Sequence, residues 1–297
     1  MIRATQIEAN GLVFDAEVCG EDRNPLVLLL HGFPQTSHTW RAQLPALADA
    51  GYFAVAPNQR GYSATARPTR TSDYVTSNLI ADSLNKPTFH LVGHDWGGQL
   101  AWLIAGLCAE RVLTLTVLSW PHPQAFRASF TDDPDQHQRS QHHRALQDPD
   151  TVRLLLEDGS RRLHRTLTSQ GVPDDAAAAY MERLGNEGAL NAALNWYRAS
   201  SIAEIDSPAV SMPTLYLWGD ADASVGRVAA EGTRSLRTPD ASPGHRPWRR
   251  KSPRYEIQSI ENASAALSQK IRRRLSFPIG CFSRLSMPQG KVPSGCG

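Results

Sequence analysis

A short apolar run followed by an aspartate between glycines constrains the fold of this chain most strongly. Residues Phe89 to Val92 have the composition of a buried strand, and Gly93-His94-Asp95-Trp96-Gly97-Gly98 follows directly. Glycines around such an elbow let the backbone turn sharply from strand into helix, so the middle side chain projects from the sheet. A carboxylate there attacks carbon, which predicts that Asp95 is a nucleophile that forms an alkyl ester. The alternative, a simple helix N-cap, is less consistent with the flanking glycines.

Short β-branched and leucine-rich runs alternate with helical patterns along the chain. This alternation predicts an α/β fold, specifically a mostly parallel sheet with helices on both faces. Apolar residues at helical spacing predict helices within residues 36–50, 74–85 and 97–109. No alternating apolar run follows Glu231, where such a sheet needs its last strand. The expected strands are Leu12–Val18, Leu26–Leu30, Phe53–Ala56, Phe89–Val92, Leu113–Leu118 and Thr214–Trp218.

The strand signal stops between Pro121 and Asp206, where helical stretches rich in Arg, Asp, Gln and Ala take over. This interval predicts a helical cap inserted between two strands of the core. Asp174 to Leu184 is the clearest cap helix, because a proline precedes it and acids occupy its first turn. The expected organisation is a core of residues 1–120 and 207–231, a cap of residues 121–206 and a tail of residues 232–297.

Charge divides the chain into an acidic body and a basic tail. Residues 1–231 hold 18 Lys and Arg against 26 Asp and Glu, whereas residues 232–297 hold 13 against 3. The tail lacks interleaved aromatic residues and any readable nucleic-acid motif, so we expect no nucleic-acid partner. Its many Pro, Ser and Gly residues predict a poorly ordered end.

Composition excludes several other classes of protein. With 297 residues, 41% of them hydrophobic, the chain can form one catalytic domain with an insertion. No apolar run approaches the ~20 residues of a membrane span, and the first residues lack the regions of a signal peptide, so we expect a cytoplasmic protein. The four cysteines have no CxxC pair or ligand spacing, so we expect neither a metal site nor a disulfide framework. The oligomeric state is not indicated.

A second glycine turn follows the expected strand Leu26–Leu30. The segment His31-Gly32-Phe33-Pro34 exposes backbone N–H groups near the elbow, as an oxyanion hole requires. The expected donors are the amides of Phe33 and of Trp96, the residue immediately after the nucleophile. We expect His31 and Pro34 to border the substrate pocket.

Together these motifs resemble the α/β-hydrolase fold family, in its epoxide hydrolase-like branch. The matching segments are HGFPQTSHTW, PNQRGYSATARP, FHLVGHDWGG, NWYRA and LYLWGDAD, spread over about residues 10–231. The resemblance implies that Asp95 opens an epoxide to form a covalent ester, which histidine-activated water hydrolyses to a diol. It implies a small apolar epoxide or a related small molecule as substrate, and no cofactor.

The same resemblance gives the cap a role in ring opening. Tyr197 in NWYRA matches a tyrosine that polarises the epoxide oxygen, which suits a phenol because the developing alkoxide needs a proton or a strong hydrogen bond. A core aromatic is the alternative for Tyr197. The family usually supplies a second tyrosine, but residues 135–143 contain none and His142 occupies its place in the pocket. Ring opening is then assisted less strongly, or the substrate differs.

The resemblance also assigns the triad acid and base. In Gly219-Asp220-Ala221-Asp222 the second aspartate, Asp222, orients the histidine, whereas Asp220 suits a turn. Of ten histidines only His245 follows Asp222, which makes it the expected base. Its interval from Asp222 is short and no strand pattern precedes it, so an exposed tail residue is the alternative.

Two other functions remain compatible with the motifs. A dehalogenase could use the same nucleophile, although HGFP in place of HGNP and the lack of a carboxylate in Ser119-Trp120-Pro121-His122 disfavour the haloalkane type. The other is a non-turnover α/β-hydrolase scaffold without a functional base. In that protein an ester on Asp95 would form but would not be released quickly.

Overall fold

The computed structural model describes residues 1–81, 86–169, 171–199, 207–236 and 257–258 of the 297 residues. The strands are β1 (Arg3–Ala9), β2 (Leu12–Cys19), β3 (Leu26–Leu30), β4 (Phe53–Pro57), β5 (Phe89–His94), β6 (Val112–Leu118), β7 (Thr214–Leu217) and β8 (Ile257–Gln258). The α-helices are α1 (Gln43–Asp49), α2 (Thr76–Ala81), α3 (Trp96–Leu107), α4 (Pro123–Asp132), α5 (Pro134–Arg139), α6 (Gln141–Gln147), α7 (Thr151–Leu156), α8 (Arg161–Ser169), α9 (Asp174–Leu184), α10 (Glu187–Ala199) and α11 (Arg227–Gly232). The 3₁₀ helices are η1 (Ser37–Trp40), η2 (Ala64–Ala66), η3 (Thr71–Tyr74) and η4 (Thr233–Ser235).

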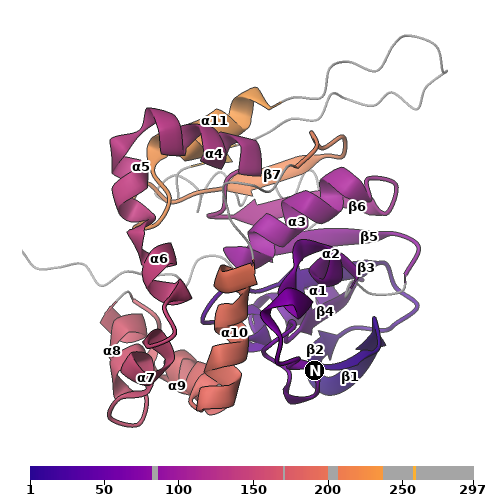
Figure 1. Ribbon diagram of the computed structural model, residues 1–297. Coiled ribbons are helices and arrows are strands. Elements are labelled where there is room, and N and C mark those ends of the chain that lie inside the picture. Colours follow the sequence, from indigo (N-terminus) through magenta and orange to yellow (C-terminus); the bar gives the residue numbers. More distant parts are fainter. Residues whose placement is uncertain (82–85, 170, 200–206, 237–256, 259–297) are drawn as a thin grey trace, which may run out of the picture.

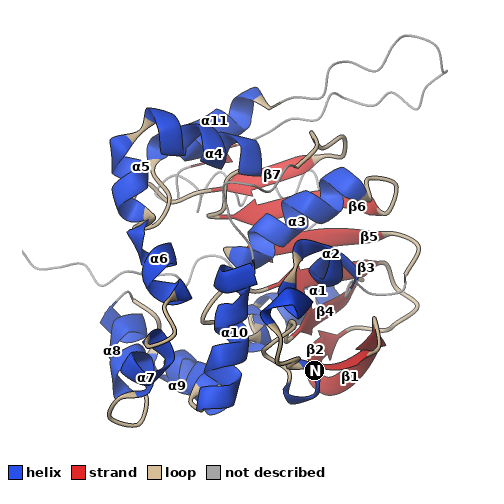
Figure 2. Ribbon diagram, in the orientation of Figure 1, coloured by secondary structure: helices blue, strands red, loops and turns tan. Residues whose placement is uncertain are grey.

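The strands form one sheet in the order β1-β2-β4-β3-β5-β6-β7-β8. The pairs β1–β2 and β2–β4 are antiparallel, and every later pair is parallel. Helices flank this sheet (Figures 1 and 2). The predicted α/β fold, a mostly parallel sheet flanked by helices, is confirmed.

The central strands are apolar throughout because both faces of the sheet are covered. Every residue of β3 is buried. Leu28 packs in the cluster that includes α3, whereas Val27 and Leu29 pack in a second cluster with Leu44 of α1. Since successive side chains of a strand point to opposite faces, α3 and α1 cover opposite sides of the sheet.

The two edge strands lie outside the expected set. Strand β1 is largely exposed and lacks an alternating apolar pattern, so nothing in its composition identifies it. The sequence pattern also predicts no strand after Glu231, and so it misses β8. The two residues of β8 pair in parallel with Tyr216 and Leu217 of β7. The sheet therefore continues beyond β7.

In the described part of residues 119–213, the only regular elements are the helices α4 to α10, which we call the helical segment. Its helices α7, α8 and α9 gather at the lower left of Figure 1, while α10 returns toward the sheet. The indole N–H of Trp196 on α10 donates to the Arg60 carbonyl after β4, with a separation of 2.8 Å. The segment occupies the interval where a cap is expected, and its function as a cap stays a prediction.

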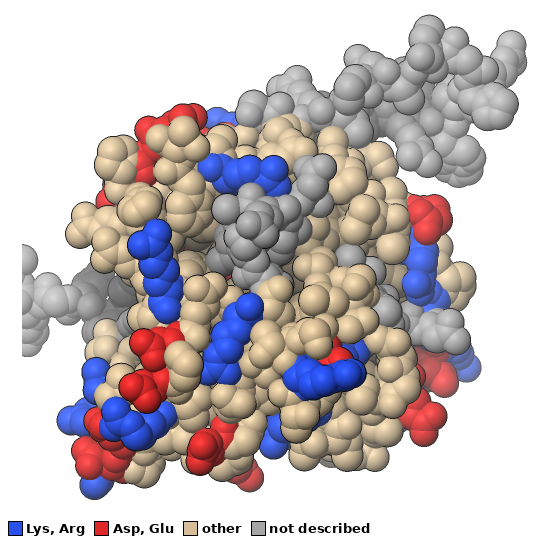
Figure 3. All heavy atoms as spheres, viewed as in Figure 1, with Lys and Arg blue, Asp and Glu red and all other residues tan. Residues whose placement is uncertain are grey.

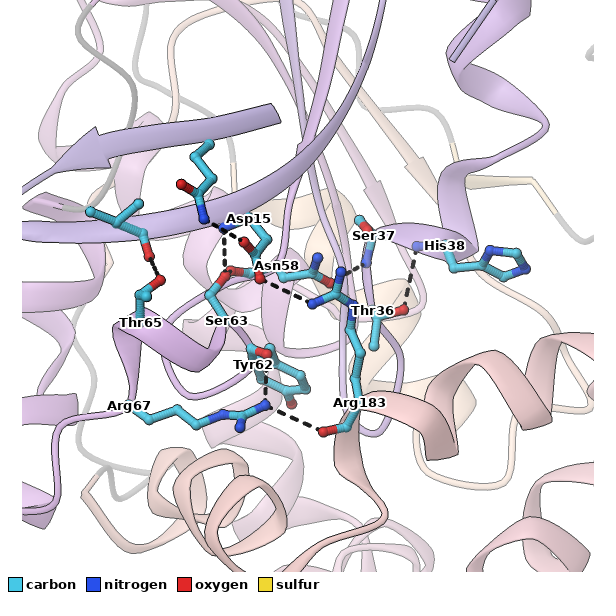
Figure 4. Close-up of polar contacts among 12 residues, drawn as sticks. Asp15, Thr36, Ser37, His38, Asn58, Tyr62, Ser63, Thr65, Arg67 and Arg183 are labelled. Atoms are coloured by element: carbon cyan, nitrogen blue, oxygen red, sulfur yellow. Dashed lines mark hydrogen bonds and ion pairs between the residues drawn. The ribbon is translucent and has the colours of Figure 1, made fainter. Parts of the chain in front are cut away.

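A polar contact connects α9 to the N-terminal strands (Figure 4). The Arg183 guanidinium lies 3.1 Å from a carboxylate oxygen of Asp15 on β2. The Arg67 guanidinium donates to the Arg183 carbonyl at 3.3 Å and to the Tyr62 carbonyl. It also donates to the Gly61 carbonyl. Arg183 thus connects α9 to the sheet through its side chain, which pairs with Asp15, and through its carbonyl, which accepts from Arg67.

The surface carries charges of both signs. On the face in Figure 3, Lys and Arg side chains are interspersed with Asp and Glu side chains over the helices at the lower left. Within the described part of the chain, no helix is both long and apolar enough to cross a membrane.

Candidate active site

Asp95 stands alone between β5 and α3, in the elbow that the glycines predict. Its backbone angles are φ 54° and ψ −123°, a strained conformation for a residue with a side chain. A Cβ at Gly97 would lie 2.3 Å from the carbonyl oxygen of Leu30, so only glycine lets α3 start this close to β3. The elbow geometry therefore requires the small residue that the sequence supplies.

The Asp95 carboxyl group meets the two amides expected in the oxyanion hole. Its Oδ1 atom accepts a hydrogen bond of 2.9 Å from the backbone N–H of Phe33. The backbone N–H of Trp96 also acts on this carboxyl group and lowers its pKa. A Cβ at Gly32 would lie 2.4 Å from Oδ1, so the glycine makes room for the carboxylate beside the Phe33 amide.

Opposing influences set the protonation of Asp95. The side chain keeps part of its surface exposed, yet burial is the largest influence and raises its pKa. His94, the amides of Trp96 and Phe33, and His142 lower that pKa in turn. Positive charge and N–H donors around the carboxyl group favour the ionised form, which is the form that attacks carbon.

His31 and Pro34 lie in the turn after β3. His31 is fully buried; its Nδ1 lies 2.9 Å from the carbonyl of Gly32, and its Nε2 accepts from the Gln59 N–H at 3.2 Å. Burial lowers the pKa of His31 to about 4, so the ring is neutral and supports the turn. Pro34 is partly exposed and follows a cis peptide bond from Phe33. A role for either residue in binding substrate stays a prediction.

Tyr197 of α10 lies in an aromatic group beside the elbow. Its ring centroid is 5.0 Å from that of Trp96 and 5.5 Å from that of Phe33. Burial raises the pKa of Tyr197 well above its ordinary value, and the charge of Asp95 raises it further. The hydroxyl group therefore stays protonated and able to donate. The structure brings Asp95, Phe33, Trp96 and Tyr197 together.

Two adjacent histidines of α6 face the same region. His142 Nδ1 lies 2.8 Å from the carbonyl of Arg139, and its ring centroid is 4.2 Å from that of His143. The His143 ring lies 5.4 Å from Tyr197 and 6.4 Å from Trp96. Burial lowers the pKa of His143 to about 3, so this ring is neutral. The sequence motifs identify His142 but not His143, whose position depends on how α6 packs.

Trp120 is a second residue that the motifs do not identify as part of the site. It is buried just after β6, and its ring stacks on Trp96 with centroids 6.0 Å apart. The signal was available, because the carboxyl ends of neighbouring parallel strands meet at one edge of a sheet. Aromatic side chains thus line the region beside Asp95.

The loop after β7 carries Asp222. Its Oδ1 atom accepts hydrogen bonds from the backbone N–H groups of Ser224 and Val225, at 2.8 and 3.0 Å. Its carbonyl oxygen accepts from the Arg139 guanidinium at 2.5 Å. His245, the expected base, lies outside the described residues, so the pairing of Asp222 with His245 stays a prediction.

Other features of the described residues do not add to this site. No group of three His, Cys, Asp or Glu side chains among them could hold a metal ion. A hollow between the sheet and α3, lined by Leu28, Leu100 and Trp196 among others, does not include Asp95. The site is therefore identified by its side-chain chemistry rather than by the size of a cavity.

Comparison with known proteins agrees with this geometry. Residues 25–249 match the profile of the family described as alpha/beta hydrolase fold. The chain is 31% identical over 246 residues to the AB hydrolase superfamily protein YfhM of Bacillus subtilis (strain 168), covering 78% of this chain and 86% of YfhM. It is 34% identical over 246 residues to epoxide hydrolase 4 of Mus musculus, covering 77% of this chain and 68% of that protein.

A solved structure extends the likeness to the fold. A crystal structure of an epoxide hydrolase from Bacillus megaterium superposes with a TM-score of 0.76, covering 92% of this chain and 98% of that one, at 22% identity. The fold similarity and the sequence relatives point to the same family. The chain belongs to the α/β-hydrolase family, in its epoxide hydrolase-like branch.

Proposed function

We propose that this protein hydrolyses a small apolar epoxide to a diol through an ester on Asp95. The observation that carries the proposal is the Asp95 carboxyl group itself. It is held in a strained elbow, with Oδ1 bonded to the Phe33 amide. That bond fixes one oxygen and leaves the other to attack a ring carbon. Strain at the elbow keeps the side chain directed away from the helix that follows.

Tyr197 assists the first step by donating to the ring oxygen. Its buried hydroxyl group stays protonated beside Asp95, and the alkoxide that forms on ring opening needs such a donor. The aromatic rings of Phe33, Trp96 and Trp120 border this region, which favours apolar epoxides over charged ones.

The second step is attack of water on the Asp95 ester. Negative charge then develops on the oxygen that was Oδ1, where the Phe33 amide already donates, and the Trp96 amide also acts on this carboxyl group. Asp222 orients the base that activates the water, and His245 is the residue assigned to that role. This step releases the diol and restores the carboxylate.

The first experiment follows the oxygen atoms. A single turnover of styrene oxide by excess enzyme in water labelled with heavy oxygen should give unlabelled diol, and the label should enter Asp95. In the ester route the oxygen added to the diol comes from the carboxylate, whereas direct attack by water labels the diol at once. Asp95→Asn should abolish ester formation with little change in fold. Labelled diol in the first turnover would refute the ester route.

A matched pair of substitutions tests the triad acid. Asp222→Asn should slow ester hydrolysis and leave ester formation nearly unchanged, whereas Asp220→Asn, at an exposed turn position two residues earlier, should change neither. His245→Gln should resemble Asp222→Asn. Steady turnover that His245→Gln leaves unaffected would contradict the assignment of the base.

The two alternatives predict different products. A dehalogenase releases halide from a haloalkane and gives no diol from the epoxide. A non-turnover scaffold gives one equivalent of ester and then stops, in the unaltered protein as well as in the Asp222 variant. Measuring diol, halide and bound ester in parallel separates all three outcomes.

A further inference from the structure

Gln136, on α5 of the helical segment, is a buried polar side chain that the proposed mechanism does not use. Its exposed fraction is 0%, whereas Asp135 and His137 on either side of it are exposed. A buried amide lowers stability unless hydrogen bonds replace those that it loses to water. The partners of Gln136 should therefore explain why an amide, rather than an apolar side chain, occupies this position.

These partners lie mainly in the loop after β7, which carries Asp222. The Nε2 atom of Gln136 donates to the Ser224 carbonyl at 2.8 Å and to the Ser140 hydroxyl at 2.9 Å. Its Oε1 atom accepts from the Gly226 N–H at 2.7 Å. Both hydrogens of the amide nitrogen are thus used, and the amide oxygen is used as well. Two of these three bonds join α5 to the loop.

One peptide group of this loop is held between Gln136 and Asp222. The group that links Ser224 to Val225 presents its carbonyl to Nε2 of Gln136 and its N–H to Oδ1 of Asp222. A trans peptide group is planar, and its C=O and N–H bonds point in opposite directions. Rotation of this group would therefore break its bonds to Gln136 and to Asp222 together.

Two other side chains hold neighbouring parts of the same loop. The indole N–H of Trp218 donates to the Val225 carbonyl at 3.1 Å, and the Arg139 guanidinium donates to the Asp222 carbonyl. Neither of these bonds involves the peptide group that donates to the Asp222 carboxylate. Of the three side chains, Gln136 is the one that fixes the direction of that N–H.

We propose that Gln136 is a positioning residue for Asp222, an inference that rests on the proposed function. Asp222 orients the base through the carboxylate oxygen other than Oδ1. The direction of that oxygen depends on Oδ1, which is held by the peptide group that Gln136 keeps in place. The helical segment thus acts on release of the ester as well as on ring opening, for which it supplies Tyr197.

The experiment measures formation and release of the ester separately. The full-length protein, in excess over styrene oxide, is quenched in acid at successive times, and the esterified peptide that contains Asp95 is quantified by mass spectrometry. Gln136→Met keeps a side chain of similar length and removes its three hydrogen bonds. This variant should slow release on the order of 10-fold, because a misplaced group loses rate without changing the chemistry, and should leave formation nearly unchanged. Gln138→Met, at an exposed glutamine of the same helix, should change neither step.

A double variant distinguishes positioning of Asp222 from a general loss of structure. If Gln136 acts through Asp222, adding Gln136→Met to Asp222→Asn should slow release no further than Asp222→Asn alone. A merely structural role predicts that the two losses multiply. Where Gln136→Met does not fold, Gln136→Asn takes its place in both measurements. Its shorter side chain cannot reach the loop but leaves room for water beside the Ser224 and Gly226 groups, so it should fold and still slow release.

The possible results separate the inference from the proposed function. Unchanged release in the folded Gln136 variant overturns the inference, as do losses that multiply in the double variant. If the unaltered protein forms the ester but does not release it, Gln136 has no step to support, and the inference fails while the ester on Asp95 stands. If the unaltered protein forms no more ester than Asp95→Asn, the proposed function fails, and the inference fails with it.

Discussion

Gly97→Ala tests whether the close contact of α3 with β3 creates the elbow. At an ordinary helix position this substitution stabilises a protein by up to about 1 kcal/mol, because alanine loses less conformational freedom on folding. At Gly97 the new Cβ would lie 2.3 Å from the Leu30 carbonyl oxygen and 2.6 Å from that of His31, closer than the 3.0 Å that real Cβ atoms keep. Both clashing atoms belong to the backbone and cannot rotate away, so α3 must move by several tenths of an ångström. The expected net cost is about 1–3 kcal/mol, the range found for overpacked cores.

The assay compares Gly97→Ala with Gly188→Ala in urea unfolding and in ester formation. Gly188 is exposed on α10, and a Cβ there would meet only the Asn186 side chain at 3.8 Å, an ordinary contact. The Gly97 variant should unfold at lower urea with an unchanged slope, since the surface exposed on unfolding stays the same. The Gly188 variant should be neutral or slightly stabilised. Movement of α3 should also open the bond from Phe33 to Asp95 and slow ester formation in the Gly97 variant only.

One result would refute this reasoning directly. If Gly97→Ala were as stable and as active as Gly188→Ala, the backbone contact at 2.3 Å would not limit the elbow. Loss of stability with an unchanged rate of ester formation would separate the two claims. The contact would then stabilise the fold without positioning Asp95.

Three further predictions concern other parts of the molecule. Tyr197→Phe should slow ester formation on the order of 10²-fold in a single turnover, and an unchanged rate would remove it from the mechanism. A double-mutant cycle of Asp15→Asn and Arg183→Gln should give a salt-dependent coupling below about 1 kcal/mol, since the side chains are 27% and 39% exposed. A larger coupling would show that this ion pair contributes more than an ordinary surface pair. The pKa of His31 is about 4 in the folded protein and 6.5 in the unfolded chain, so the unfolded chain takes up the proton at a higher pH. The free energy of unfolding should therefore decrease as the pH is lowered from about 6.5 to about 4. That loss should be smaller in His31→Gln, as measured by urea unfolding at several pH values.

The fold was predictable wherever burial is complete. β3 and the neighbouring parallel strands are covered on both faces, so their sequences are continuous apolar runs. Such runs identify a strand without knowledge of the strand that pairs with it. β1 is exposed and gains its structure from pairing with β2, which leaves no periodic signal. β8 contains two residues and is defined only by its partner β7. Strands that depend on a neighbour rather than on their own composition are the ones that the sequence patterns miss.

In the candidate site, too, residues set by local sequence were predictable and residues set by packing were not. Asp95 and the amides of Phe33 and Trp96 could be placed because the glycine turns dictate their backbone, and the backbone alone sets the hydrogen bond from Phe33 to Oδ1. His143 could not, because its position depends on how α6 packs against Tyr197. Trp120 was missed although its place directly after β6 puts it at the same edge of the sheet as the elbow. A sequence therefore predicts backbone turns and the N–H groups that they expose. It does not predict which side chains of the helical segment contact the edge of the sheet.

The two steps of the proposed reaction should therefore respond to substitution separately. Ring opening depends on side chains around Asp95, and release of the ester depends on the loop that holds Asp222. One carboxylate oxygen of Asp222 already accepts two backbone N–H groups, which leaves the other to orient a base. The Arg139 guanidinium donates to the Asp222 carbonyl, so this side chain supports the loop that holds Asp222. Arg139→Ala should thus slow ester release, as Asp222→Asn should, and leave ester formation nearly unchanged, whereas Tyr197→Phe should slow only ester formation.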